Sequence, residues 1–339
     1  MLRPLRVAVL QGGRSSEHEV SLNSARSVAE SLDPARYEVR TIEIGREGKW
    51  ALAPPRERAE VGTGTTLPVP SANGVQPFAE IDVVFPVLHG PFGEDGTVQG
   101  FLELAGVAYV GAGVTASALC MDKDLFKSVM RDKGVPVTRS VTVLARHRDR
   151  VENPFGFPVV VKPARLGSSV GISIVKAPED LAAAVDLALG HDEKVLLEEY
   201  VQGVEVECSV LGNEEPIASI PGEIVPLASD WYDYEAKYAE GGMELVVPPR
   251  ISEEATRRVQ ELAVAAFVAA DCEGMARVDF FVRDNGEVLV NELNTIPGFT
   301  ATSVYAKLFE ASGISYAELL DRLVELALER RDRRAALRF

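Results

Sequence analysis

The chain has 339 residues, 46% of them hydrophobic, so it can bury more than one core, and two or three domains are expected. Its formal net charge of -16 argues against nucleic acid or an anionic membrane surface as a partner, because both are bound by a basic face. Three cysteines without a CxxC pair, and no apolar stretch of the ~18 residues that a membrane span needs, predict a protein of the reducing cytoplasm.

The first third of the chain alternates apolar strands with helical segments. Residues 7–10 form an apolar run that ends at a glycine pair, and Ser16 and Glu19 fit a capping box in front of a helix. A second helix is expected at 97–105. Further strands are expected at 38–44, 81–88 and 107–110. This alternation predicts an open parallel α/β sheet over residues 1–117.

Residues 118–210 predict a small α+β unit. After a helix near 122–133, FPVVVKPARLGSSVGISIV gives two strands joined by a glycine-serine loop. VLLEEYV and EVECSVL add two more strands, with a helix at 179–189 between the pairs. Lys162 ends the first strand, and backbone N–H groups of the loop after it are placed to fold over phosphate. The sequence has no GxxxxGK[ST] motif, which excludes a P-loop.

Residues 211–339 predict further strands, a helix near 252–270, a hairpin at 276–294 and a closing helix from Tyr316. The arginine-rich end of that last helix, ERRDRR, is interpreted as a solvated helix terminus. The segment 229–242 is unusual because it gathers one tryptophan and three tyrosines among acids and a lysine, with no large aliphatic residue beside them.

The hairpin RVDFFVRDNGEVLVNELN is the most informative stretch. Its Asn-Gly dipeptide between two alternating strands predicts a two-residue type I′ turn, which fixes the register. With this turn, Asp284 pairs with Glu287, and counting outward sets Asp279 directly across from Glu292. Two opposed carboxylates at about 5 Å repel by roughly 3 kcal/mol at an effective dielectric of ~20, so a positive group must lie near them.

The same register places Arg277 across from Asn294, on the face that carries the two acids. Arg277 supplies part of the positive charge, but the carboxylates and the amide offer hard oxygen ligands, which suit Mg²⁺ or Mn²⁺. The alternative is a solvent-facing strand with a salt bridge. The segment TIPGFTATS, which follows with a glycine turn and hydroxyl groups, favours the metal site.

A second glycine pattern suggests a different class of enzyme. GAGVTA at 111–116 fits the dinucleotide pattern GxGxxA and has Asp132 at about the right distance beyond it, as in nicotinamide-dependent oxidoreductases. However, the pattern follows the fourth strand of its sheet rather than the first. This alternative also leaves the hairpin acids without a role.

Four separated stretches resemble the D-alanine–D-alanine ligase family of the ATP-grasp enzymes, and the resemblance covers essentially the whole chain. These stretches are GGRSSEHEVS (12–21), HGPFGEDGTVQG (89–100), YDYEAKY (232–238) and GMARVDFFV with VNELNTIPG (274–298). The resemblance implies an ATP-grasp fold behind an amino-terminal parallel-sheet domain. It also implies a cytoplasmic, homodimeric enzyme that uses ATP and two Mg²⁺ or Mn²⁺ ions to join two D-alanines for peptidoglycan synthesis.

The resemblance also implies roles for particular residues. The residues implied for metal binding are Asp279, Glu292 and Asn294. Those implied for ATP binding are Lys123, Lys162, Ser169, Glu198, Val201, Glu205, Lys237 and Phe281. Those implied for catalysis are Glu17, Ser168, Tyr238, Arg277 and Gly298. Those implied for the substrates are His89, Ser303 and Val304. Because water would hydrolyse an acyl phosphate, the ring-rich segment 229–242 is expected to be a lid over bound ATP.

Several of these residues also have plain structural explanations. Glu17 fits a first-turn helix acid, His89 a buried histidine, and Glu198 and Glu205 solvated surface acids. Tyr238 favours an amine as the second nucleophile over D-lactate, for which the family typically has phenylalanine. D-serine or D-lactate as second substrate, and an inactive nucleotide-binding regulator on the same fold, remain alternatives.

Overall fold

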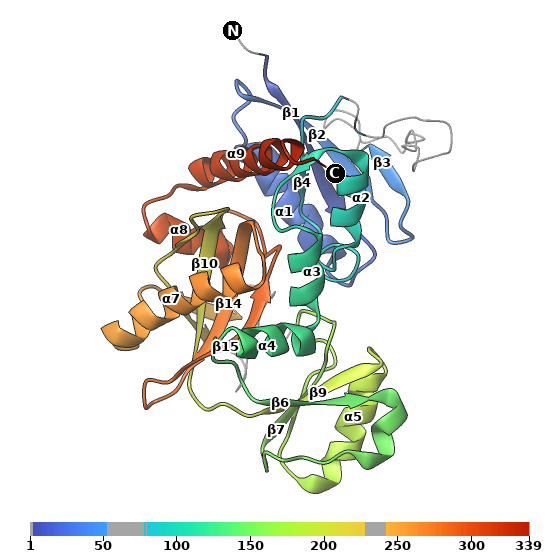
Figure 1. The fold of residues 1–339 in the computed structure, drawn as a ribbon, viewed down its shortest axis with the longest axis vertical. Helices are drawn as coiled ribbons and strands as arrows, with labels where there is room; N and C mark the ends of the chain where they lie inside the picture. Colours follow the sequence, from blue (N-terminus) through green and yellow to red (C-terminus); the bar gives the residue numbers. More distant parts are fainter. Residues whose placement is uncertain (1–2, 53–77, 79, 228–241, 339) are drawn as a thin grey trace.

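The computed structural model describes residues 3–52, 78, 80–227 and 242–338. Residues 229–241 of the ring-rich segment, including Lys237 and Tyr238, lie outside these ranges. The described chain forms three β-sheets, with the amino-terminal sheet at one end of the molecule, a six-stranded sheet in the middle and a four-stranded sheet at the other end (Figure 1). None of the helices in the described ranges is both long and apolar enough to span a membrane.

The amino-terminal sheet has the order β3-β2-β1-β4-β5. Its strands are β1 (Leu5–Gly12), β2 (Tyr37–Ile44), β3 (Trp50–Leu52), β4 (Val83–Pro86) and β5 (Ala108–Tyr109). All pairs are parallel except the edge pair β2–β3, which confirms the predicted open parallel sheet and adds a strand that was not predicted. Because successive strand residues point to opposite faces, α1 (His18–Ser31) and α2 (Thr97–Ala105) cover one face each.

The predicted capping box of Ser16 and Glu19 does not form. Helix α1 begins at His18, with Glu17 at the N-cap position, and no side chain caps it. Glu19 is therefore the second residue of the helix rather than the third, so it is one position short of reaching back to the N-cap N–H. It forms an exposed ion pair with Arg46 at 2.9 Å instead.

The four-stranded sheet has the antiparallel order β6-β9-β7-β8 and is called the central sheet here because its strands come between those of the other two sheets in the sequence. Its elements are β6 (Ser140–Leu144), β7 (Val159–Pro163), β8 (Ser173–Val175), α5 (Leu181–Leu189) and β9 (Lys194–Glu199). The strand EVECSVL was wrongly grouped with this unit. It forms β10 (Val204–Gly212), which pairs with β14 in the third sheet. Between β9 and β10 the chain passes from one sheet to the other at Gly203. This position requires glycine, because a Cβ there would lie 2.4 Å from the Val282 carbonyl oxygen.

The third sheet has the order β13-β12-β10-β14-β15, with β11 beside β10. Its strands after β10 are β11 (Ile217–Ala218), β12 (Gly222–Pro226), β13 (Met243–Val246), β14 (Gly274–Val282) and β15 (Val288–Asn294). The other α-helices of the described residues are α3 (Val114–Met121), α4 (Lys123–Asp132), α7 (Glu253–Ala269), α8 (Val304–Ala311) and α9 (Tyr316–Ala335).

The turn of the β14–β15 hairpin differs from the prediction. The Arg283 N–H donates to the Glu287 carbonyl at 2.9 Å, so the loop holds three residues instead of two and ends at Gly286 with φ of 84°. A left-handed residue at this position is the usual end of a three-residue hairpin loop. The predicted Asp284–Glu287 pair is therefore wrong.

The important cross-strand pairs nevertheless form as predicted, Arg277 with Asn294 and Asp279 with Glu292. A β-bulge shifts the register by one residue between Asp279 and Phe280, and this shift cancels the extra residue of the turn. Two errors of one residue thus compensate each other, and the acids lie opposite each other.

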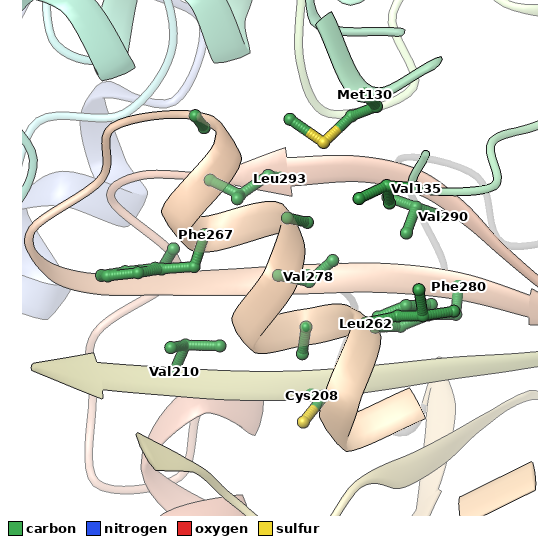
Figure 2. Packing of buried hydrophobic residues seen from close by; sticks show 14 of the residues in the cluster. Met130, Val135, Cys208, Val210, Leu262, Phe267, Val278, Phe280, Val290 and Leu293 are labelled. Carbon is green, nitrogen blue, oxygen red and sulfur yellow. The ribbon is translucent and has the colours of Figure 1, made fainter. Parts of the chain in front are cut away.

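The largest core lies between α7 and one face of the third sheet. Leu262 and Phe267 of α7 pack over Cys208, Val278 and Phe280 of the strands (Figure 2). All three cysteines are free and buried, as predicted. Since alternate residues of β14 point to opposite faces, the burial of Val278 and Phe280 turns Arg277, Asp279 and Phe281 to the other face. The hydrophobic pattern of this strand therefore aims the polar residues at the functional site.

The arginine-rich end of α9 is not the solvated terminus that was predicted. Arg330 is 3% exposed and donates to the carbonyls of Gly111 and Tyr109, the second at 2.7 Å. Its guanidinium also lies over the Tyr109 ring, 4.2 Å from the centroid. Arg334 forms an ion pair with Glu273 at 3.3 Å. These contacts connect the last helix to both the amino-terminal sheet and the third sheet, because the arginines point into the interface between them.

Candidate active site

A cavity of about 410 Å³ lies between the central sheet and the third sheet. This volume is typical of a site for a small molecule. Its walls include the following predicted site residues: Lys123, Lys162, Ser168, Ser169, Glu198, Val201, Glu205, Asp279, Phe281 and Glu292. The structure therefore brings together residues that are up to 169 positions apart, from Lys123 to Glu292.

Lys123, the first residue of α4, lies at the base of the glycine-serine loop. Its backbone N–H donates to the Ala164 carbonyl at 3.0 Å, and its ammonium donates to the Leu166 carbonyl at 2.9 Å. Burial lowers the pKa of Lys123, but Glu292 at 3.1 Å and neighbouring carboxylates outweigh burial and raise the pKa above its usual value. The side chain therefore carries a fixed positive charge under the loop.

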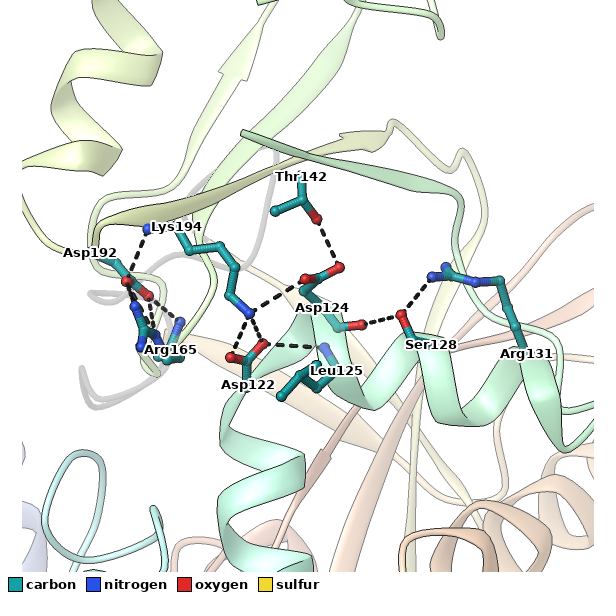
Figure 3. Close-up of polar contacts among 9 residues, drawn as sticks. All are labelled: Asp122, Asp124, Leu125, Ser128, Arg131, Thr142, Arg165, Asp192 and Lys194. Carbon is teal, nitrogen blue, oxygen red and sulfur yellow. Dashed lines mark hydrogen bonds and ion pairs between the residues drawn. The ribbon is translucent and has the colours of Figure 1, made fainter. Parts of the chain in front are cut away.

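A polar network holds this loop and α4 in place (Figure 3). Arg165, at the start of the loop, donates its backbone N–H to Asp192 at 2.8 Å and its Nε at 3.2 Å. Lys194 forms an ion pair with Asp122, the N-cap residue of α4, at 2.6 Å. Since Lys194 begins β9 and Asp192 lies two residues before it, the network fixes the loop relative to Lys123.

Ser168 and Ser169 at the tip of the loop have φ of 55° and 59°, a left-handed conformation that is uncommon for residues other than glycine. Such strain costs about 1–3 kcal/mol per residue and collects at ligand-binding loops. The Ser168 hydroxyl donates to the Glu17 carboxylate at 2.5 Å. The structure thus brings together Glu17 and Ser168, two of the residues that the resemblance implies for catalysis; a third, Tyr238, lies outside the described residues.

The Glu17 carboxylate lies between two glycines. A Cβ on Gly90 would be 2.9 Å from Glu17 Oε2, and one on Gly167 would be 3.8 Å from it. Gly90 also has φ of 72°, so both its conformation and the close approach require glycine. Next to it, His89 is buried, and its Nδ1 bonds the Ile296 carbonyl at 3.0 Å, which places the proton on Nδ1. Burial lowers the pKa of His89, so its ring is neutral.

Arg277 is held rigidly among acids on the polar face of β14. Its Nε lies 2.7 Å from Asp279 Oδ1 and 2.9 Å from Glu207 Oε2. Asn294 donates its amide N–H to Asp279 at 3.0 Å. Within the described ranges, no group of three or more His, Cys, Asp or Glu side chains is placed to hold a metal. The candidate metal ligands are the carboxylates of Asp279 and Glu292 and the side-chain amide of Asn294.

Glu198 lies at the centre of a buried ion network. Its carboxylate pairs with Lys127 at 2.9 Å and with Lys162 at 2.7 Å, and Thr138 donates to it. Burial raises the pKa of Glu198, but Lys127 and Lys162 outweigh burial and lower the pKa to about 2. Glu198 is thus ionised and 3% exposed, and the surface-acid explanation for it was wrong. Lys162 also contacts the Asn291 amide oxygen at 3.3 Å.

The neighbouring acid, Glu199, has a different role. It accepts hydrogen bonds from the Arg139 backbone N–H at 2.9 Å and from Arg283 at 3.1 Å. It therefore joins the central sheet to the β14–β15 hairpin across the back of the cavity. Val201 is buried in the linker after β9, and Glu205 lies directly across from Phe281.

The start of α8 supplies backbone donors. Ser303 occupies its N-cap position, and its hydroxyl accepts the Thr300 N–H at 3.0 Å. The first N–H groups of a helix, beginning with Val304, have no intrahelical partner and favour an anion. A Cβ on Gly298 would lie 3.5 Å from the Ser303 hydroxyl, so this turn packs against the helix start.

The dinucleotide-like turn at 111–116 does not form a cofactor site. The Gly111 carbonyl accepts a hydrogen bond from Arg330, and a Cβ on Gly274 would lie 3.1 Å from Gly111 Cα. The backbone of the turn is therefore covered by α9 and β14 where a pyrophosphate would have to approach. The nicotinamide alternative lacks a binding surface at this turn.

Two family models cover most of the chain. The family described as "D-ala D-ala ligase N-terminus" matches residues 6–112, and "D-ala D-ala ligase C-terminus" matches residues 129–325. The chain belongs to the D-alanine–D-alanine ligase family. A D-alanine–D-alanine ligase of Chloroherpeton thalassium is 46% identical over 96% of each chain.

Two solved structures of this family share the fold. The VanG D-Ala:D-Ser ligase of Enterococcus faecalis has a TM-score of 0.86 at 37% identity, covering 96% of this chain and 100% of the other. The D-alanine–D-alanine ligase of Coxiella burnetii has a TM-score of 0.86 at 38% identity, covering 98% and 97%. The ATP-grasp fold behind a parallel-sheet domain, which the sequence predicted, is therefore confirmed.

Sequence reasoning missed three buried polar residues of this family member, Lys127, Thr138 and Glu207. Lys127 lies one helical turn after Lys123, and this i, i+4 pair of lysines was the available signal. Thr138 and Glu207 carry no such signal, because their partners are distant in the sequence. Glu94, in the stretch HGPFGEDG, was visible in the motif but was given no role.

Proposed function

We propose that this chain is an ATP-dependent ligase that joins two D-alanines to D-alanyl-D-alanine for peptidoglycan precursor synthesis. The observation that carries the proposal is the meeting of Glu17, from the amino-terminal unit, with the strained serine loop beside a cavity that holds Lys123, Lys162 and two opposed acids. Family membership supports the same conclusion.

In the first step, the carboxylate of one D-alanine attacks the γ-phosphorus of ATP, giving an acyl phosphate and ADP. The charge that spreads over the transferring phosphoryl group needs fixed cations. Lys123 and Lys162 are placed to supply them, and we assign Lys237 and the backbone around Ser169 to the same phosphates. Glu198, Val201, Glu205 and Phe281 are assigned to the adenosine.

In the second step, the amine of the other D-alanine attacks the acyl carbon, and phosphate leaves as the peptide bond forms. The oxyanion of the tetrahedral intermediate is stabilised by donors that are already oriented. Arg277, fixed by Asp279 and Glu207, and the Gly298 N–H are assigned to this oxyanion. Rigid donors suit this role because they do not reorganise during the reaction.

The two substrates are assigned to different donors and acceptors. Glu17 binds the ammonium of the first D-alanine, and His89 lies on the same side of the site. Ser303 and the backbone N–H of Val304, at the start of α8, bind the carboxylate of the second D-alanine. We further propose that residues 229–242 form a lid that excludes water from the acyl phosphate, with Tyr238 completing the contact with Glu17 and Ser168.

Asp279, Glu292 and Asn294 would hold Mg²⁺ or Mn²⁺, two ions in all. The donor set fits, because it consists of hard oxygen atoms on one strand face. The bound ions would neutralise phosphate oxygens. Lys123 and Arg277 form ion pairs with the two acids and balance part of their charge.

The direct test is phosphate release by the purified protein with ATP, Mg²⁺ and D-alanine. Release that requires D-alanine, together with the dipeptide in the product, is expected, and no release at millimolar D-alanine would refute the proposal. Competition between D-alanine, D-serine and D-lactate tests the second substrate, and Tyr238 favours amines. We also propose a cytoplasmic homodimer, which sedimentation of the full chain would test.

A further inference from the structure

Glu94 is a partly buried acid that the proposed reaction does not use, yet it connects two loops of the site. Its Oε2 accepts the Gly90 N–H at 2.7 Å, and its Oε1 accepts the Ile296 N–H at 3.1 Å. Gly90 belongs to the loop after β4, and Ile296 to the loop after β15. One carboxylate thus receives one backbone donor from each loop.

Both loops carry proposed substrate contacts close to these bonds. Gly90 follows His89 and approaches the Glu17 carboxylate, whereas Ile296 lies two residues before Gly298. A second bond joins the same loops, since His89 Nδ1 contacts the Ile296 carbonyl at 3.0 Å. The Ile296 peptide is therefore held on both sides, by Glu94 through its N–H and by His89 through its carbonyl.

We propose that Glu94 is a positioning residue for the first D-alanine. The ionised carboxylate of Glu94 fixes the Gly90 loop against the Gly298 loop. This inference rests on the proposed ligase function. Glu94 does not touch the reacting atoms in this scheme. It acts by setting the spacing between Glu17, which holds the substrate ammonium, and Gly298, which holds the oxyanion.

The protonation state of Glu94 decides whether both bonds form. A carboxylate accepts both N–H groups, whereas a protonated carboxyl uses one oxygen as a donor and loses one of them. Desolvation and the nearby Glu17 raise the pKa of Glu94 to about 8, although the two backbone hydrogen bonds and the Lys123 ammonium lower it. Among the described residues, the buried Cys120 thiol on α3 also lies near Glu94, and His89 contacts the same Ile296 peptide.

The test compares Glu94→Gln with Asp95→Asn in the full chain. Glutamine offers one acceptor and places an NH₂ group against the second donor, so one loop is released. Asp95 is a matched control, because it also accepts two backbone N–H groups, from Phe92 and Thr97, but both belong to its own segment. Above a pH of about 8, where Glu94 is ionised, Glu94→Gln is expected to lower kcat/KM for D-alanine about 100-fold, because a misplacement of about 1 Å has an effect of this size, and KM for ATP should not change.

The pH profile separates positioning from stability. The substrate amine titrates equally in both proteins, so the ratio of wild-type to Glu94→Gln kcat/KM isolates Glu94. This ratio is expected to rise with pH through about 8. A ratio that is flat with pH, or a variant that loses only thermal stability, would overturn the inference.

If Glu94→Gln does not fold, hydrogen exchange of the wild-type protein decides the question. The Ile296 amide, corrected for its intrinsic exchange rate, should be better protected above the Glu94 pKa than below it, and equal protection would overturn the inference. A wild-type protein without D-alanine-dependent phosphate release would refute the proposed function instead. An active wild type with a normal Glu94→Gln variant would refute only the role of Glu94.

Discussion

Replacement of Lys127 by methionine tests the buried ion network most directly. Its ammonium is 0% exposed and lies 2.9 Å from Glu198 and 3.1 Å from the Asn291 carbonyl. At an effective dielectric of about 20, a charge pair at this distance attracts by about 6 kcal/mol. Burial opposes this attraction strongly enough to lower the pKa of Lys127 to about 8.

Most of the loss of stability in Lys127→Met therefore comes from Glu198, the buried carboxylate that loses this partner. Removing one member of a buried pair costs about 3–5 kcal/mol, and because Lys162 still contacts Glu198, we expect the low end, about 3 kcal/mol of unfolding free energy. Urea unfolding measures this loss. KM for ATP should also rise, because Glu198 and Lys162 line the cavity.

Lys133→Met is the control, because it makes the same replacement at an exposed position just after the same helix, where less than about 0.5 kcal/mol is expected. The double variant Lys127→Met/Glu198→Met should lose more stability than Lys127→Met, since it leaves the buried Lys162 ammonium without its partner at 2.7 Å. If Lys127→Met unfolds at the same urea concentration as Lys133→Met, the reasoning about the buried pair is wrong.

Three further predictions concern other regions. Arg330→Met should cost about 3 kcal/mol in thermal unfolding, because two buried carbonyls lose a charged donor, whereas Arg331→Met, exposed beside Asp332, should cost less than about 0.5 kcal/mol. Arg277→Lys should lower kcat about 100-fold with little change in KM, because lysine lacks the planar fork that Asp279 and Glu207 hold; an unchanged kcat would remove Arg277 from the oxyanion. The pKa of Glu198 is lowered on folding to about 2, so its stabilising effect is complete above its unfolded pKa of about 4.3 and is lost as pH falls toward 2. The free energy of unfolding, measured by circular dichroism, should therefore fall less steeply with decreasing pH between about 4.3 and about 2 in Glu198→Gln than in the wild type. Identical slopes in the two proteins would contradict this assignment.

Local patterns in the sequence predicted the elements of the site well. The alternation in β14 and β15 was enough to place Asp279 across from Glu292, because the buried face of each strand fixes its polar face. The turn itself was mispredicted, since Asn-Gly also fits a three-residue loop that ends in a left-handed glycine. Asp279 still pairs with Glu292 because a β-bulge cancels the error in the turn, and no sequence pattern predicts this bulge.

Contacts between distant segments could not be predicted. Lys127 and Glu198 are 71 residues apart, and neither position shows a pattern that requires the other. The arginines after Glu329 looked like an ordinary basic helix end, because a helix terminus in water and one in an interface have the same local composition. Only the packing of α9 between two sheets shows that Arg330 is an interior residue.

The position of α9 has a consequence for the order of folding during synthesis. Val7 and Val9 of the first strand share a core with Leu319, Leu320 and other residues of the last helix. Helix α1 covers part of that face, but the rest stays uncovered until α9 has left the ribosome, so the nascent amino-terminal layer exposes apolar surface until then. Chaperone dependence should therefore be greatest for chains stalled just before α9, and emergence of α9 should end it.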